Sequence, residues 1–450
     1  MVDPLVLAER NVPRYTSYPT APYFSGTVGV DTYRDWLGAL PADASLSLYI
    51  HVPYCENICL YCGCLTKAVR RQEPVDAYAE RLSAELDLLA GALPARRLVH
   101  IHWGGGTPSI LGTRHLSDLA EKIAEHFDVT GLVEHAIELD PRRVSAPLVK
   151  TLASLGVNRA SLGVQDFSPK VQNTIGRVQS FEQVRDAVAL LRASGITRIN
   201  MDLMYGLPYQ EVADVERSAE LAASLGPQRI ALFGYAHVPW FRHHQKLIAE
   251  ASLPGAAERL EQMGAAGRAF AAHGYAAIGL DHFALADDTL ATAQRTGRLH
   301  RNFQGYTTDV ADALIGVGAS SIGRLPQGFV QNAPDLPGYA RAVDSGRFAI
   351  VKGIAFSDDD RLRSRIIERL MCDLSVDLDA EIAAAPPAAR PADGFAAELA
   401  AIAYLTEAGM VQIEERRIAV TDRGRPFVRL VAAAFDAYLP QQKSRHSVAV

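Results

Sequence analysis

Residues 49–64 read Tyr49-Ile-His-Val-Pro-Tyr-Cys-Glu-Asn-Ile-Cys-Leu-Tyr-Cys-Gly-Cys64, and this stretch holds four of the five cysteines of the chain. Three of them, Cys55, Cys59 and Cys62, follow the spacing C-x3-C-x2-C. A short loop with this spacing can place three thiolates around one face of an iron–sulfur cube and leave the fourth iron without a protein ligand. Since an iron with an open position can bind a substrate or a cofactor, the stretch predicts a reactive iron–sulfur site.

Clustered cysteines have two other common uses. A structural zinc site is usually closed by four ligands in two separated pairs, and no second pair of this kind follows in the sequence. Disulfides are typical of small secreted domains, and nothing marks this 450-residue chain as secreted. Ligand chemistry therefore favours an iron–sulfur cluster, with zinc or a redox pair as the open alternatives.

The composition is that of an ordinary globular protein that can bury one large core and a smaller domain. Of the 450 residues, 48% are hydrophobic, and 45 basic against 51 acidic side chains give a formal net charge of -6. This balance does not indicate a nucleic-acid surface or an anionic-membrane surface. Any site for an anion must therefore be local.

Residues 1–10 carry an acidic side chain early and lack the basic start and the apolar core of a secretory signal. No later segment has about eighteen consecutive apolar residues, so no transmembrane helix is expected. Because the cysteines are few, clustered and expected to be reduced, we predict a cytoplasmic protein.

From residue 45 onward, short apolar runs alternate with longer helical patterns, which indicates successive βαβ units on a parallel sheet. The expected strands are Leu46–Val52, Leu98–Trp103, His135–Leu139, Ala160–Val164, Ile199–Leu203 and Ile230–Phe233. The expected helices are Val75–Ala90, His115–Phe127, Pro147–Leu155, Phe181–Ala193 and Val212–Leu225. Six units are fewer than the eight that close a full barrel, so the α/β core is predicted to be an open six-unit barrel.

Polar or glycine-rich residues follow every expected strand, at the end where parallel α/β folds bind their ligands. In chain order these are the loop that carries Cys55, Cys59 and Cys62 (the cysteine loop), the turn Trp103–Pro108, the segments Glu138–Arg142 and Gln165–Asp166, Asp202 with the segment Tyr205–Pro208, and the segment Gly234–Pro239. One such element per strand is more than plain loops require. We therefore expect these elements to share one site.

The regions flanking the 45–250 core differ from it in pattern. Residues 1–44 form an N-terminal arm, whose proline-rich part at 11–24 should be irregular and extended. Residues 251–356 read as a more helical extension of the barrel that contributes to the substrate site. An arm like that at 11–24 is more often surface packing than a site, but its Arg14 and three tyrosines could still reach over a pocket.

Residues 357–450 predict a separate, mainly helical domain. A helix with an acidic start runs to Cys372, and an alanine- and proline-rich connector at 383–392 follows. The remainder reads as a helix, a hairpin around 411–421 and a closing helix, which is similar to a winged helix. We interpret this region as a structural or lid domain.

Several single residues are ambiguous on the sequence alone. The glycines at 104–106 let the backbone come close to a ligand, but glycine-rich turns are also common in plain loops. Glu138 ends an apolar strand, where a carboxylate needs a partner or a cleft. Gln165, Arg177 and Asp202 belong to types that are most often solvated surface groups or helix caps.

The short sequence segments around these residues resemble segments of known enzyme families. The stretch from Tyr49 to Cys64 resembles the signature of the radical S-adenosylmethionine (SAM) enzymes. The words Pro13-Arg-Tyr-Thr-Ser-Tyr-Pro19, Leu162-Gly-Val-Gln-Asp-Phe167, Asn200-Met-Asp-Leu-Met-Tyr-Gly-Leu-Pro208 and Tyr235-Ala-His-Val-Pro239 closely resemble the family of oxygen-independent coproporphyrinogen III oxidases. The match runs over nearly the whole chain.

The resemblance implies a radical SAM partial barrel that converts two propionates of coproporphyrinogen III to vinyl groups, yielding protoporphyrinogen IX. It implies a 4Fe-4S cluster on the first three cysteines and SAM as cofactors, with Cys64 not needed by the cluster. It further implies a reduced flavodoxin or ferredoxin-type electron donor. The residues so implied are Tyr49, Gly105, Glu138 and Ile322 for a first SAM, and Tyr61, Gly106, Thr107, Gln165, Arg177, Asp202 and Ala236 for a second.

Other roles are expected from chemistry. His51 lies two residues beyond Tyr49 on the same strand face and is a candidate for a catalytic contact, or else a satisfied core histidine. A tetracarboxylate substrate must meet cationic side chains, for which Arg14, Arg301 and His237 are candidates against ordinary surface roles. Cys372 is expected to be a buried small hydrophobe. We expect a monomer, because no exposed heptad pattern is evident.

Two rival functions remain at this point. A heme chaperone or heme-handling relative would share the barrel and the first three cysteines but commonly lacks a cysteine at position 64 and the proline-tyrosine arm, which are both present. A redox or metal-binding module without radical chemistry would have no use for a SAM pocket. The glycine turn and Glu138 argue against this second rival.

Overall fold

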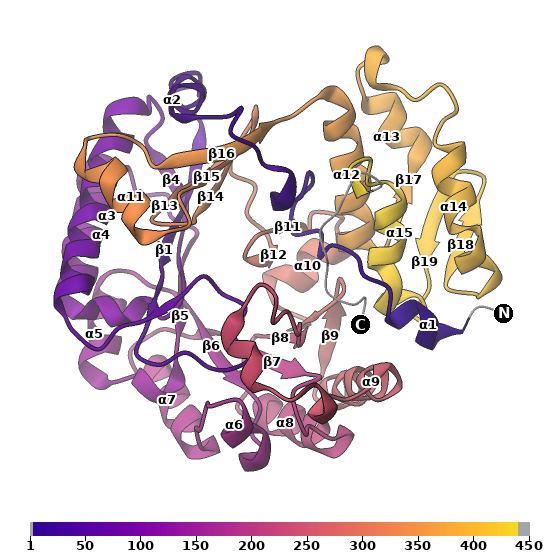
Figure 1. The fold of residues 1–450 in the computed structure, drawn as a ribbon, viewed down its shortest axis with the longest axis horizontal. Coiled ribbons are helices and arrows are strands. Elements are labelled where there is room, and N and C mark those ends of the chain that lie inside the picture. The colour runs from indigo at the N-terminus through magenta and orange to yellow at the C-terminus, as the bar shows by residue number, and fades with distance from the viewer. Residues whose placement is uncertain (1–2, 440–450) are drawn as a thin grey trace.

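A 12-stranded mixed sheet forms the centre of the molecule in the computed structural model, which describes residues 3–439. Six strands run parallel in chain order and form a curved wall (Figure 1). Each strand extends a residue or two beyond one or both of its predicted ends. The six parallel strands confirm the predicted open six-unit barrel. The strands are β1 (Ser45–Val52), β4 (Arg97–Gly105), β5 (Glu134–Leu139), β6 (Arg159–Gln165), β7 (Arg198–Tyr205) and β8 (Arg229–Gly234).

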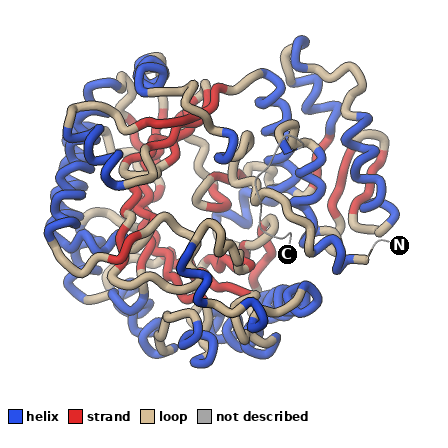
Figure 2. Tube along the Cα trace, in the orientation of Figure 1, coloured by secondary structure: helices blue, strands red, loops and turns tan. Residues whose placement is uncertain are grey.

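Helices link the parallel strands and cover the outer side of the wall, as Figure 2 shows in blue outside red. α7 illustrates why they form: Ser180 and Gln183 make a capping box at its start. Its buried positions recur at helical spacing and face the sheet. The linking helices are α3 (Glu73–Ala92), α4 (Gly112–His126), α5 (Ala146–Ser154), α6 (Pro169–Thr174), α7 (Phe181–Ala193) and α8 (Val212–Ser224).

The structure corrects the expectation of a mainly helical pattern after residue 250. α9 (Ala256–Ala272) is helical, but most of the following elements are strands that widen the sheet at both edges. β13 (Ala313–Val317) pairs parallel with β1, and the remaining sheet strands of this region pair antiparallel. They are β9 (Tyr275–Ile278), β10 (His282–Leu285), β14 (Ile322–Leu325), β15 (Gly328–Asn332) and β16 (Ile350–Ala355).

These strands escaped prediction because small residues interrupt their apolar alternation. The run at 316–323 spans the turn from β13 to β14, and Gly318 adopts a φ of 95° there, which a residue with a side chain rarely takes. Two further short strands, β11 (His300–Asn302) and β12 (Gly305–Thr307), form a separate hairpin beside the sheet.

The N-terminal arm runs between the barrel and the C-terminal region, as the indigo trace in Figure 1 shows. Its part at 11–24 is irregular as predicted, apart from a single 3-10 turn at Ala21–Tyr23, and it lies between α1 (Pro4–Ala8) and α2 (Val30–Gly38). The Tyr15 hydroxyl donates to Asp436 at 3.0 Å, and the Tyr23 hydroxyl donates to the carbonyl of Tyr438 at 2.7 Å. These contacts tie the arm to the C-terminal region.

The C-terminal region confirms the predicted order of helix, hairpin and helix. Ser357 and Asp360 cap the acidic start of α12 (Asp358–Asp373), in which Cys372 is fully buried as expected. The connector at 383–392 holds a short 3-10 helix. The winged-helix likeness itself stays a prediction. The remaining elements are β17 (Ser375–Asp377), α13 (Leu378–Ala384), α14 (Ala396–Glu407), β18 (Val411–Glu414), β19 (Arg417–Val420) and α15 (Val428–Ala434).

The longest helices of the described chain carry too many polar side chains to cross a membrane, and none of the helices within residues 3–439 qualifies as a membrane span.

Candidate active site

A cavity of about 540 Å³ opens at the carboxyl ends of the parallel strands. It is the place where the elements that follow successive strands meet, as the sequence predicts for a parallel sheet. Cys64 also lines it and is exposed there. The predicted site residues that line this cavity are Cys55, Cys59, Tyr61, Cys62, Gly105, Gly106, Thr107, Glu138, Gln165, Arg177, Asp202 and Ala236.

The three motif cysteines present their thiols to this one cavity. Cys55 contacts the Thr107 hydroxyl at 3.3 Å, and burial raises the pKa of its thiol to about 11. A hydrogen bond from Cys64 instead lowers the pKa of the Cys62 thiol. Within the described residues, no three side chains of His, Cys, Asp or Glu converge on a point that would hold a single metal ion.

This arrangement bears on which metal group fits the cysteine loop. A zinc ion draws its ligands to about 2.3 Å from one point. Thiols spread along a loop that faces an open cavity fit a cluster, in which each thiolate binds a different iron. The cysteine loop therefore fits a 4Fe-4S cluster better than a mononuclear zinc site.

A segment after β8, which includes the start of a 3-10 helix at His243–Leu247, holds the cysteine loop in place. Arg242 donates through Nε to the carbonyl of Gly63, His244 donates to the carbonyl of Cys62, and Gln245 donates to the carbonyl of Tyr61, each at 2.8 Å. We call residues 242–245 the clasp. Sequence reasoning missed it, and its only signal was its place after the sixth strand.

The glycine turn packs directly on β1 and on the cysteine loop. Gly105 has a φ of 114°, and a Cβ at this position would lie 2.8 Å from the His51 ring. A Cβ on Gly106 would lie 2.5 Å from the carbonyl oxygen of Tyr54. Glycine is therefore required here by the protein beneath the turn, whichever ligand lies above it.

Glu138 at the end of β5 has both the partner and the cleft that the sequence predicted. Its carboxylate accepts from the Gly105 amide at 3.1 Å and contacts His102 Nε2 at 3.2 Å. The side chain remains 37% exposed toward the cavity. It can accept a hydrogen bond from an amino or hydroxyl group of a ligand.

Gln165 and Arg177 lie where β6 breaks its register with β7. Gln165 has a φ of 69°, a strained conformation for a residue with a side chain, and the pairing shifts between Gly163 and Gln165. Arg177 donates to the Gly163 carbonyl at 2.6 Å and contacts the Cys59 sulfur at 3.5 Å. A fixed positive charge thus lies beside one motif cysteine.

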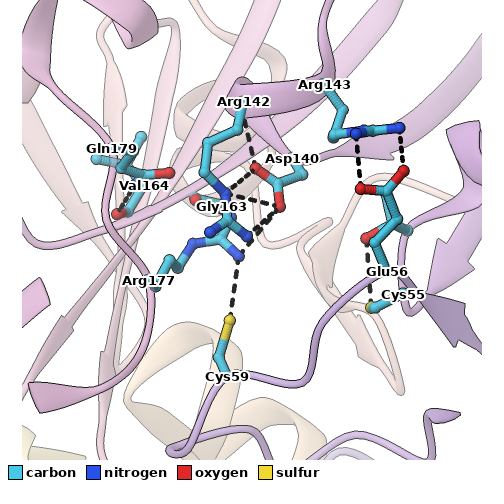
Figure 3. Close-up of polar contacts among 11 residues, drawn as sticks. Cys55, Glu56, Cys59, Asp140, Arg142, Arg143, Gly163, Val164, Arg177 and Gln179 are labelled. Carbon is cyan, nitrogen blue, oxygen red and sulfur yellow. Dashed lines mark hydrogen bonds and ion pairs between the residues drawn. The ribbon is translucent and has the colours of Figure 1, made fainter. Parts of the chain in front are cut away.

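An ion-pair network continues from Arg177 along the rim of the cavity (Figure 3). Asp140 pairs with Arg142 at 2.6 Å and with Arg177 at 3.4 Å. Burial opposes the charge of Arg177, but Tyr61, Asp140 and Cys59 outweigh it and raise the pKa of the guanidinium. The network ties the end of β5 to the cysteine loop.

Asp202 on β7 is a buried carboxylate held by neutral donors. It accepts from Ser161 at 3.0 Å and from Asn200 at 2.8 Å. Burial, reinforced by the charge of Glu138, raises the pKa of Asp202 to about 6. It is therefore a weak acid poised near neutral pH, suited to a ligand hydroxyl or amino group.

Three predicted residues do not line the cavity. Tyr49 and His51 lie on the same face of β1, with the Tyr49 hydroxyl 3.0 Å from His51 Nδ1, and both pack beneath the glycine turn. The carbonyl of Ile322 lies over Gly316, the neighbour of Tyr49 on β13. Tyr49 and His51 thus lie behind the turn, whereas Ile322 lies on β14, beside the strand that pairs with β1.

The three candidate residues for binding the substrate also lie in different places. Arg14 and Arg301 line a second, smaller pocket, and Arg14 also borders the cysteine cavity. His237 lines neither, and its Nδ1 lies 2.9 Å from the Tyr235 hydroxyl. Arg259 and Arg429, which join the second pocket, were missed because they lie within helices and no local pattern marks them.

Two family models match this chain. The Radical SAM superfamily matches residues 49–222, and the HemN C-terminal domain matches residues 356–427. The barrel, the cysteine loop and the shared cavity thus define a protein of the radical SAM class, whose cofactors are a 4Fe-4S cluster and SAM.

The relatives narrow the class. The chain is 46% identical to an oxygen-independent coproporphyrinogen III oxidase of Bradyrhizobium diazoefficiens, over 98% of both chains. It is 38% identical to the one of Escherichia coli, over 96% of this chain and 94% of the relative. The solved structure of coproporphyrinogen III oxidase (HemN) from Escherichia coli, a radical SAM enzyme, superposes with a TM-score of 0.88 at 35% identity, covering 95% of this chain and all of that one. The chain belongs to the family of oxygen-independent coproporphyrinogen III oxidases.

Proposed function

We propose that this protein converts coproporphyrinogen III to protoporphyrinogen IX without oxygen. At each of two propionates, the β-carbon loses a hydrogen atom, and the side chain then loses carbon dioxide and one electron, which leaves a vinyl group. The electron passes to an external one-electron acceptor. The observation that carries the proposal is the single cavity onto which the motif cysteines and the polar ends of the parallel strands open.

When bound, the reduced cluster and SAM supply the radical chemistry that removes the hydrogen atom. We propose that Cys55, Cys59 and Cys62 hold the cluster, and that Cys64 tunes Cys62 through its hydrogen bond without being a ligand. Glu138 would accept from a first SAM, with Gly105 approaching it closely. Tyr49 would act from behind the turn, and the resemblance assigns Ile322 on β14 to the same SAM.

A second SAM or the substrate edge would meet the other wall of the cavity. Its residues are Tyr61, Gly106, Thr107, Gln165, Arg177, Asp202 and Ala236, and all seven line the cavity. Arg177 would stabilise negative charge near Cys59, and Asp202 would accept from a hydroxyl or amino group. His51 is proposed as a positioning residue that supports Gly105, because its ring packs under that glycine.

Further partners follow from the chemistry. A reduced cluster requires a one-electron donor, and we propose a flavodoxin or ferredoxin-type protein for this role. A groove of about 500 Å³ that includes Cys55, Arg142 and Arg143 gives such a donor an approach to the cysteine loop. We further propose a monomer that works in the cytoplasm, consistent with the five free cysteines.

An anaerobic assay tests the function. The iron-reconstituted protein is incubated with SAM, a strong reductant and coproporphyrinogen III, and the porphyrins and 5'-deoxyadenosine are separated by chromatography. Protoporphyrin together with deoxyadenosine is the expected result. Deoxyadenosine without protoporphyrin, accompanied by tight heme binding, would move the protein to a heme-handling function.

A further inference from the structure

A second pocket, of about 50 Å³, adjoins the cysteine cavity and is rich in arginine. Arg14, Phe233, Gly234 and Tyr235 line both spaces, so the pocket opens next to the proposed reaction site. The described residues that line the pocket bring four guanidinium groups and one carboxylate, that of Asp281. We call Arg14, Arg259, Arg301 and Arg429 the arginine pocket.

Each of these arginines is held by a contact of its own. Arg14 donates to the Gly234 carbonyl at 2.9 Å, and Arg259 donates to the Tyr235 carbonyl at 3.0 Å. Arg301 lies 4.4 Å over the Tyr306 ring and 3.5 Å from the Asp281 carboxylate. Arg429 contacts the carbonyl of Val12 at 3.4 Å. The guanidinium groups are therefore positioned before a ligand arrives.

The pocket concentrates positive charge away from bulk water. The side chain of Arg301 is 5% exposed, and Arg429 is 7% exposed. Burial and the charge of Arg14 lower the pKa of Arg429, whereas Arg14 itself is exposed. Guanidinium groups stay charged at neutral pH, so the repulsion between Arg14 and Arg301 favours an anionic ligand. A planar carboxylate matches the fork of a guanidinium group.

The size of the pocket limits how much of a ligand it takes. On this measure a single water molecule needs about 10–15 Å³, so a pocket of about 50 Å³ has room for a group the size of a carboxylate. The ring system would have to lie in the larger cavity, which the pocket joins at Arg14 and Tyr235.

We propose that the arginine pocket anchors one propionate of the substrate that is not being converted. This inference rests on the proposed function. The converted propionate leaves as neutral carbon dioxide and gives up its negative charge. Surrounding cations would stabilise the departing carboxylate in the ground state and so oppose that loss, whereas they hold a spectator carboxylate without such a cost.

The test compares two arginines of the same arm in the full-length protein. Arg14→Ala removes a member of the arginine pocket. Arg10→Ala is the matched control, because Arg10 also makes one guanidinium hydrogen bond to another segment, to the Tyr404 hydroxyl at 2.9 Å, but lines neither pocket. The binding probe is coproporphyrin III, the stable oxidised tetracarboxylate, followed by fluorescence quenching. A second probe is its derivative with all four carboxyls blocked as neutral hydroxyethyl amides.

The Kd of coproporphyrin III is expected to rise about tenfold in Arg14→Ala and to stay unchanged in Arg10→Ala. The amide probe should bind all three proteins equally, since it has no carboxylate. In turnover the KM for coproporphyrinogen III should rise by a similar factor, with iron content and SAM binding unchanged. Arg301→Lys should also weaken coproporphyrin III, because a lysine keeps the charge but loses the fork.

The experiments can overturn the proposed carboxylate site and the proposed function independently of each other. Normal conversion with unchanged coproporphyrin III affinity in both Arg14→Ala and Arg301→Lys would overturn the pocket and leave the function standing. An equal loss of affinity for the amide probe would also overturn it, by showing a structural effect. Loss of coproporphyrin III affinity in a protein that never makes protoporphyrin would support the carboxylate site and overturn the proposed function.

Discussion

The cysteine loop draws its three thiols from residues 55–62, whereas the arginine pocket draws its four guanidinium groups from positions 14, 259, 301 and 429. The first site is made by one stretch of chain, and the spacing of its cysteines alone indicates the chemistry. The second is made by the arm, α9, β11 and α15, and no local pattern marks it. Neighbouring sites in one enzyme can thus differ completely in what their sequence shows.

The largest effect should come from breaking the local site. Cys62→Ala is expected to remove the cluster and lower turnover by more than about 1,000-fold, because the cluster loses one of its three thiolate ligands. Cys64→Ser is the matched control and should keep its iron. Iron analysis and the anaerobic assay check both. Full iron and activity in Cys62→Ala would show that the ligand assignment is wrong.

The second prediction concerns Asp281, the one acid among the described residues that line the same pocket as the four arginines. Asp281→Asn should lower the free energy of unfolding at pH 7 by about 3 kcal/mol, because Arg301 loses a partly buried charged partner. Urea denaturation measures this. Asp287→Asn, an exposed neighbour in the same region, is the control and should change little.

The same pair predicts a pH dependence. Burial would raise the pKa of Asp281, but Arg301 and His282 outweigh it and hold the pKa well below its usual range. A depressed pKa stabilises the fold above the unfolded pKa of about 4, and this stability is lost as the pH falls below that value. Asp281→Asn should therefore lose less stability between about pH 4 and pH 2 than the unchanged protein. Equal losses in both would contradict the buried pairing.

Asp202 lines the cysteine cavity and combines both kinds of information. A sequence motif predicted its place in the site, and burial in the tertiary structure sets its pKa. Asp202→Asn should lower turnover about tenfold, because an amide is a weaker acceptor than a carboxylate. Its raised pKa of about 6 means that the folded state favours the protonated form. The protonated carboxyl therefore contributes to the stability of the fold below about pH 4, and this stability is lost as the pH rises through 6.

The asparagine variant should therefore be more stable than the unchanged protein at pH 8, by about 1–2 kcal/mol, in thermal or urea unfolding. Asp186→Asn on the surface of α7 is the control for both readouts. Unchanged turnover would remove Asp202 from the site, even if the stability rose as expected.

The smallest effect should come from the clasp. Gln245→Ala removes the hydrogen bond to the Tyr61 carbonyl and the one from the Val238 amide, so the cysteine loop loses support. Loss of about 1 kcal/mol should speed iron release to a chelator about fivefold. Lys246→Ala, at the exposed next position, should leave the release rate unchanged. Equal release from both variants would show that the clasp does not restrain the loop.

Prediction from sequence succeeded where a repeated local pattern exists. The six parallel strands and the helices between them followed from periodicity, and their carboxyl ends brought Glu138, Gln165 and Asp202 to one cavity as expected. It failed for β13–β16, whose alternation is broken by small residues at turns such as Gly318. The position of His51 also escaped it, because the close packing of Gly105 on its ring is a contact between two strands.

The sequence by itself determined the cysteine loop, because chain connectivity alone keeps Cys55, Cys59 and Cys62 within reach of one cluster. It also determined the barrel, since apolar periodicity reports directly which faces are buried. Only the tertiary structure decided the arginine pocket and the clasp. An arginine such as Arg429 within a helix carries no sign of whether it will face water or another guanidinium group, because that depends on which distant segment packs against it.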